Sequence, residues 1–175
     1  MAKNIVIGVG NILFCDDGIG VIAAEYLKKN YSYAPELEIL DGGTLGLNLI
    51  EYFLHYDNVF ILDTLSMDEE AGNIYKIPSH ELLGRGGYKS TAHEVEVVQM
   101  LEAAQLYDTK AQVSVFGIVA EDISRVQIGL SETLNTRFEL FIQAVIEEVV
   151  ELGIEVSKKE ILTLEDIIKG FKCQS

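Results

Sequence analysis

The chain has 175 residues, 49% of them hydrophobic and 23% charged, with 13 basic against 28 acidic side chains and a formal net charge of −15. This length and composition are typical of one globular domain and exclude an intrinsically disordered chain. The negative charge disfavours binding to nucleic acid or anionic membranes. No apolar run reaches the ~18 residues that span a bilayer, and the first residues lack a signal-peptide layout. We therefore expect a cytoplasmic protein.

Strand-like and helix-like segments alternate along the chain, as in a mostly parallel sheet with helices on both faces. Short continuous apolar runs predict buried strands, and apolar residues spaced three and four apart predict helices. In chain order we expect a strand at Asn4–Val9, a helix at Ile19–Asn30, a strand at Leu37–Leu40, a helix from Thr44 to His55, strands at Val59–Leu62 and Asn73–Ile77, a helix from Thr91 to Tyr107, a strand at Val113–Val119, a helix from Ser131 towards Gly153 and a helix at Leu164–Phe171.

Local signals define several of these elements. Pro78 directly after a strand favours an antiparallel strand near a sheet edge. Thr91 and Glu94 have the spacing of a capping box. We predict a single three-layer α/β/α domain over residues 1–156, with a mostly parallel twisted sheet and one antiparallel edge strand. Residues 157–175 are expected to form a helical tail packed on or near that domain.

Acidic residues follow or end the first three predicted strands. Asp16 and Asp17 come after the first strand, Asp41 ends the second and Asp63 ends the third. Open α/β sheets bind their ligands at the carboxyl ends of the strands. A carboxylate placed directly after a buried strand is costly unless it is hydrogen-bonded, paired or metal-bound. Acids on three successive strands therefore indicate a site, although Asp17 alone would also suit a helix N-cap.

His93 is the fourth candidate for this site. In the capping-box interpretation it lies in the first turn of its helix, where the helix dipole favours the neutral imidazole that binds metals. Two carboxylates and one histidine suit a borderline divalent metal, with positions left open for water or substrate. The alternative for His93 is a surface or capping role. His55, at a helix end, and His80, in a loop, are expected to be surface residues.

At these residues the sequence resembles the hydrogenase maturation protease family, the endopeptidases that trim the C-terminus of the large subunit of nickel–iron hydrogenases. The resemblance rests on five blocks in the family's order, and they cover the chain to about residue 150. The blocks are Ile7–Leu13 running into Asp16–Gly20, then Ile39–Thr44, then Ile61–Asp63, then His93, and more weakly Gly117–Val119 with Ile128–Ser131.

The resemblance implies that Asp17, Asp63 and His93 bind nickel already inserted into the hydrogenase precursor. The protease then holds no firmly bound metal of its own and no organic cofactor. The expected partner is the precursor of the large subunit, which loses a C-terminal peptide only after nickel insertion. The family also suggests a monomer. We hypothesise that the metal-held geometry positions the scissile bond and that Asp17 or Asp41 activates water as general base.

One departure from the family concerns the first ligand. Well-known members have Glu where this chain has Asp17, and the shorter side chain must come closer to the same metal. The neighbouring Asp16 competes for this role. The sequence leaves the choice between the two open.

Three other functions are compatible with parts of the sequence. Gly8 and Gly10 suggest a nucleotide-binding module, but Leu13 stands where the third glycine of that fingerprint belongs, and the acidic pair would repel phosphate. A cysteine hydrolase using Cys15 is disfavoured because the neighbouring acids raise the thiol pKa. A chaperone that senses the metal without cutting would use the same site, so that only a cleavage assay separates it from a protease. Cys15 and Cys173 are expected to be unbridged thiols.

Overall fold

The computed structural model describes residues 1–84, 92–106, 109–159 and 161–174, and the side chains of Leu47 and of residues 92–96 lie outside this description. The strands are β1 (Asn4–Val9), β2 (Tyr31–Ala34), β3 (Glu38–Gly43), β4 (Asn58–Leu65), β5 (Ile74–Pro78), β6 (Gln112–Val119) and β7 (Glu155–Lys158). The helices are α1 (Ile19–Asn30), α2 (Ile50–His55), α3 (Ser79–Gly84), α4 (Ala92–Leu106), α5 (Glu132–Glu151) and α6 (Leu164–Lys172), with short 3-10 helices η1 (Cys15–Gly18) and η2 (Gly46–Leu49).

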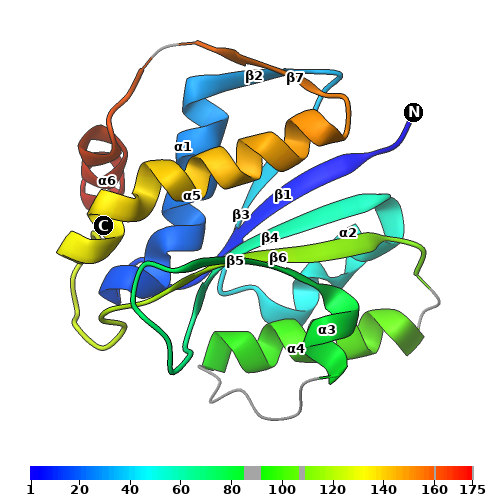
Figure 1. Ribbon diagram of the computed structural model, residues 1–175, viewed down its shortest axis with the longest axis horizontal. Helices are drawn as coiled ribbons and strands as arrows, with labels where there is room; N and C mark the ends of the chain where they lie inside the picture. Colours follow the sequence, from blue (N-terminus) through cyan, green and yellow to red (C-terminus); the bar gives the residue numbers. More distant parts are fainter. Residues whose placement is uncertain (85–91, 107–108, 160, 175) are drawn as a thin grey trace.

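Five strands form one sheet in the order β3-β1-β4-β6-β5. The first four run parallel to one another, and β5 pairs antiparallel with β6 at the edge. In Figure 1, α1, α5 and α6 cover one face of this sheet, and α2, α3 and α4 cover the other. The predicted three-layer α/β/α fold with an antiparallel edge strand is therefore confirmed.

The central strands are apolar throughout because both of their faces are covered. All six residues of β1 are buried. Val6 packs with the α1 and α5 side of the core, whereas Ile5 and Ile7 pack with residues of α2 and α4 on the opposite side. Successive side chains of a strand point to opposite faces, and a strand between two helical layers must therefore be apolar at every position.

Several elements differ from the sequence-based expectation. The helix expected from Thr44 begins later, as η2, and continues as α2; Gly46, the first residue of η2, has a φ of +52°. The short strands β2 and β7 were not predicted, and they pair antiparallel to form a separate two-stranded sheet. α3 was also not predicted, and it contains His80, which was expected in a loop. The capping-box residue Thr91 lies outside the described residues.

The C-terminal segment is attached to the rest of the chain through β7 and α6. β7 crosses residue 156, the predicted domain boundary, and pairs with β2. α6 opens with a capping box between Thr163 and Asp166 and buries Ile167 and Ile168 in the α1 and α5 side of the core. The division of the chain at residue 156 stays a prediction. Within the described residues, no helix combines the length and apolar character needed to cross a bilayer.

Candidate active site at the carboxyl edge of the sheet

The turn after β1 brings two aspartates to the carboxyl edge of the sheet. Gly10 has a φ of +128° and donates its N–H to the Gly43 carbonyl at the end of β3, at 2.9 Å. A side-chain carbon at Gly10 would lie 1.9 Å from the Asp17 carbonyl oxygen, so only glycine fits. The chain then forms η1, in which Cys15, Asp16 and Asp17 are all buried.

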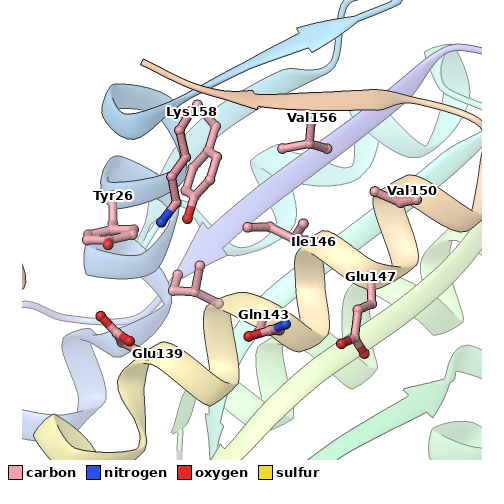
Figure 2. A pocket seen from close by; sticks show the side chains of 10 residues that line it. Tyr26, Glu139, Gln143, Ile146, Glu147, Val150, Val156 and Lys158 are labelled. Carbon is pink, nitrogen blue, oxygen red and sulfur yellow. The ribbon is translucent and has the colours of Figure 1, made fainter. Parts of the chain in front are cut away.

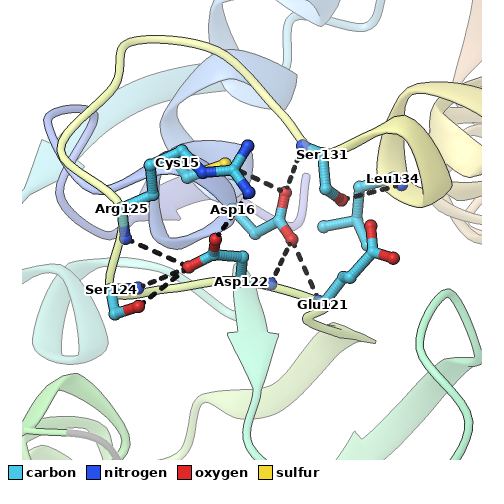
Figure 3. Close-up of polar contacts among 8 residues, drawn as sticks. All are labelled: Cys15, Asp16, Glu121, Asp122, Ser124, Arg125, Ser131 and Leu134. Carbon is cyan, nitrogen blue, oxygen red and sulfur yellow. Dashed lines mark hydrogen bonds and ion pairs between the residues drawn. The ribbon is translucent and has the colours of Figure 1, made fainter.

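Asp16 links the β1 turn to the loop between β6 and α5. Its Oδ1 accepts the N–H of Ser131 at 2.7 Å, and its Oδ2 accepts the N–H groups of Glu121 and Asp122 at 3.0 and 2.9 Å (Figure 3). The side chain is fully buried. Because both oxygens of Asp16 accept backbone donors, the carboxylate serves to join these segments. This geometry favours Asp17 over Asp16 as the candidate metal ligand.

Asp17 is held in η1 and does not cap α1. Its Oδ2 accepts the N–H of Asn11 at 3.0 Å, and its own N–H donates to the Phe14 carbonyl at 3.0 Å. The N-cap residue of α1 is Gly18, and no side chain caps that helix end. The N-cap role considered for Asp17 is therefore wrong. Because η1 lies against β4, Asp17 is close to the strand that carries Asp63.

Asp63 and Asp41 lie on different faces of the sheet. Asp63 lies inside β4, not at its end, and shares the face of Ile61, which packs with the α2 and α4 layer. Asp41 lies on β3 and shares the face of Ile39, which packs with the α1 layer. Gly8 of β1 pairs with both Asp41 and Leu62, so β3 and β4 are about 10 Å apart at this level.

Asp41 also differs from Asp17 and Asp63 in its environment. Asp17 and Asp63 are only 5% and 2% exposed, and the Oδ1 atom of Asp63 accepts the Thr64 N–H at 2.8 Å. Asp41 is exposed, and its Oδ1 accepts the Gly43 N–H at 2.9 Å. Partial desolvation raises the pKa of the Asp41 carboxyl, and the negative charge of Glu25 on α1 adds to this, while the Gly43 N–H opposes it.

His93 is the second residue of α4, and its side chain lies outside the description. α4 packs on the sheet and leads into β6, which runs parallel to β4, so the first turn of α4 lies at the carboxyl edge of the sheet. Within the side chains described, no group of three or more His, Cys, Asp or Glu residues could hold a metal ion. Because the His93 side chain is not among them, the set Asp17, Asp63 and His93 stays a prediction.

Cys15 lies in the same turn as Asp17 but is fully buried. Burial raises the pKa of its thiol, and the neighbouring Asp16 carboxylate raises it further. Its φ of +47° is uncommon for a residue with a side chain and reflects the tight turn into η1. A buried thiol of raised pKa is a poor nucleophile, so nothing supports the cysteine-hydrolase alternative.

A separate hollow lies along α5, outside this group of residues. It has a volume of about 400 Å³ and lies between α1, α5 and β7, and Tyr26, Ile146 and Lys158 are among the residues that line it (Figure 2). Ile146 is 15 residues from Ser131 along α5, which corresponds to roughly 22 Å at 1.5 Å per residue. Ser131 marks the carboxyl-edge site because its N–H donates a hydrogen bond to Asp16, so the hollow is not part of that site.

Comparison with known proteins identifies the family of this chain. The family model described as hydrogenase maturation protease matches residues 21–148. The chain belongs to the hydrogenase maturation protease family. The hydrogenase 2 maturation protease of Escherichia coli K12 is 28% identical over 160 residues, which cover 90% of this chain and 97% of that relative. The HoxM hydrogenase expression/formation protein of Cupriavidus necator is 27% identical over 158 residues, 89% of this chain and 74% of that relative.

Solved structures show the same fold. The hydrogenase maturating endopeptidase HybD from E. coli superposes with a TM-score of 0.82 at 27% identity, covering 90% of this chain and 98% of that one. The [NiFe] hydrogenase maturation protease HybD from Thermococcus kodakarensis has a TM-score of 0.69 at 20% identity, covers 84% of this chain and 99% of that one, and supports the fold alone. The predicted family is therefore confirmed, and with it a peptidase of hydrogenase maturation.

Proposed function

We propose that this family member is the endopeptidase that removes a C-terminal peptide from the precursor of a nickel–iron hydrogenase large subunit after nickel insertion. The proposal is supported by two nearly buried acids, Asp17 in η1 and Asp63 in β4, because these two elements contact each other. Buried carboxylates favour a positive partner. A nickel ion carried by the precursor provides one.

Nickel belongs to the substrate in this proposal. Asp17 and Asp63 supply carboxylate oxygens and His93 supplies an imidazole nitrogen, a mixed set that suits a borderline divalent metal. The backbone N–H of Asn11 orients the Asp17 carboxylate, and that of Thr64 orients the Asp63 carboxylate. A precursor without nickel would lack the metal that Asp17, Asp63 and His93 bind in this proposal. Binding of the precursor is therefore selective for the loaded form.

The proposed cleavage is hydrolysis of one peptide bond. Water adds to the carbonyl carbon, the C–N bond breaks, and the proton taken from water passes to the leaving amine. The general base is Asp17 or Asp41. Asp17 belongs to η1, which contacts the strand of Asp63, whereas Asp41 lies on the other face of the sheet but has the raised carboxyl pKa that suits a base. Asp41→Asn with unchanged cleavage of the loaded precursor would remove Asp41 from the mechanism.

The same proposal includes the setting of the reaction. The enzyme acts in the cytoplasm as a monomer, with the large-subunit precursor as its partner and without an organic cofactor. The nucleotide-binding alternative loses support, because the buried Asp16 and Asp17 occupy the turn where a phosphate would bind.

The test is cleavage of nickel-loaded and nickel-free precursor by wild type, His93→Ala and the control His55→Ala. His55 is exposed at the end of α2, where its Nδ1 lies 2.7 Å from the Glu51 carbonyl oxygen. Wild type and His55→Ala should cut the loaded precursor only, and His93→Ala should lose at least about a hundredfold in rate. If wild type binds the loaded precursor and never cuts it, the protein is instead a metal-sensing chaperone.

A further inference from the structure

Three large apolar side chains are exposed beside the Asp17 turn. Leu13 and Phe14, which precede η1, are 46% and 37% exposed, and Val126 in the loop between β6 and α5 is 77% exposed. We call these three residues the apolar rim. Single exposed apolar residues are ordinary on protein surfaces, but adjacent ones at the edge of a site mark a region of contact.

The two parts of the rim are held side by side by backbone hydrogen bonds. The Gln127 N–H donates to the Leu13 carbonyl at 2.9 Å, and the Cys15 N–H donates to the Gln127 carbonyl at 2.9 Å. Phe14 and Gln127 form an isolated parallel bridge. One residue back along each segment, the backbone of Val126 therefore lies next to that of Leu13.

The loop that carries Val126 is ordered by buried and local polar contacts. Asp16 anchors its start through the N–H groups of Glu121 and Asp122 (Figure 3). Asp122 in turn accepts the N–H of Arg125 at 3.0 Å and pairs with its guanidinium at 3.1 Å. A surface that is already ordered loses little conformational entropy when it binds a partner.

The rim is continuous with the candidate active site. The N–H of Asp17 donates to the Phe14 carbonyl, so the rim and the carboxylate belong to the same turn. Asp17 is three positions after Phe14, a span of at most about 10 Å even for extended chain. A peptide that covers Phe14 is therefore within reach of the metal bound by Asp17.

We propose that the apolar rim binds an apolar segment of the hydrogenase precursor next to the peptide bond that is cut. This inference rests on the proposed function. The size of the rim supports a peptide segment over a second copy of the chain. Three partly exposed apolar side chains present on the order of 300 Å², whereas a stable interface buries about 800 Å² on each partner.

The experiment compares two double variants of the full chain on nickel-loaded precursor. The rim variant is Leu13→Gln with Val126→Gln, and the matched control is Leu140→Gln with Val150→Gln, two half-exposed residues on α5. Kinetics should show a rise in KM of about tenfold for the rim variant with kcat retained, and a change below about twofold for the control. Thermal unfolding verifies that both variants fold. If the rim variant does not fold, Val126→Gln alone takes its place.

The outcomes separate this inference from the proposed function. If wild type cuts the loaded precursor and the rim variant has the same KM, the inference fails and the proposed function stands. A loss of kcat at constant KM also overturns it, because the variant has then disturbed the Asp17 turn. If light scattering shows that wild type is a dimer and the rim variant a monomer, the rim binds a second copy. If wild type does not cut at all, the proposed function fails first.

Discussion

Replacement of Asp16 by Asn tests the most connected polar contact near the site. The carboxylate accepts three backbone N–H bonds in a fully buried position. An Asn side chain keeps one acceptor oxygen, which serves Glu121 and Asp122 best from the Oδ2 position. Its amide nitrogen then faces the Ser131 N–H, at the position of a bond that measures 2.7 Å in the native protein.

The cost follows from these contacts. One buried N–H is left without an acceptor, and the two remaining bonds weaken because their acceptor has no charge. Together we expect a loss of about 3 kcal/mol in the free energy of unfolding. A domain of this size has roughly 5–15 kcal/mol in total, so the variant should still fold.

Urea denaturation followed by circular dichroism measures this loss. Asp122→Asn is the matched control, since Asp122 accepts two backbone N–H bonds and a hydroxyl in the same loop but is reached by water. Asp122→Asn should lose clearly less free energy of unfolding than Asp16→Asn. The reasoning is refuted if Asp16→Asn destabilises the protein by less than about 1 kcal/mol, or by no more than the control.

Two further predictions concern stability away from the rim. Burial raises the pKa of the Tyr33 hydroxyl, which donates to the Leu27 carbonyl at 3.1 Å. Tyr33→Phe should therefore lose about 1 kcal/mol at pH 7. Wild type should lose stability as the pH rises above about 10, because the phenol ionises first in the unfolded chain. Urea denaturation should therefore show that the difference in free energy of unfolding between wild type and Tyr33→Phe closes by pH 11. An equal difference between wild type and Tyr33→Phe at pH 7 and pH 11 would contradict this prediction. Thr64→Val should stabilise by about 1 kcal/mol, since the Thr64 hydroxyl is buried without a hydrogen-bond partner among the described residues. A loss of stability in denaturant would disprove that prediction.

Much of the fold was predictable because burial on both faces leaves a strong local pattern. β1 and α1 have the predicted bounds, and Pro78 correctly indicated that β5 lies at an antiparallel edge. The N-cap of α5 was also predictable, since Ser131 accepts the Leu134 N–H as a capping residue does. These features depend on residues close together in the chain.

β2 and β7 escaped prediction for the opposite reason. Each has four residues, with Tyr31 the one buried member, and each forms only by pairing with a segment far away in the chain. Short strands with mixed polarity have no periodic signal of their own. Their existence depends on α5 and the C-terminal chain bringing them together.

The sequence by itself determined the layered α/β fold, the family and the acids at the carboxyl edge, because apolar runs and local motifs specify these features. Only the tertiary structure distinguished the two neighbouring acids. Asp16 and Asp17 look alike in the sequence, but Asp16 meets the N–H groups of Glu121, Asp122 and Ser131, while Asp17 meets that of Asn11. Three of these four donors lie more than 100 residues away from the acids. Such long-range backbone contacts form only when the sheet and α5 are assembled.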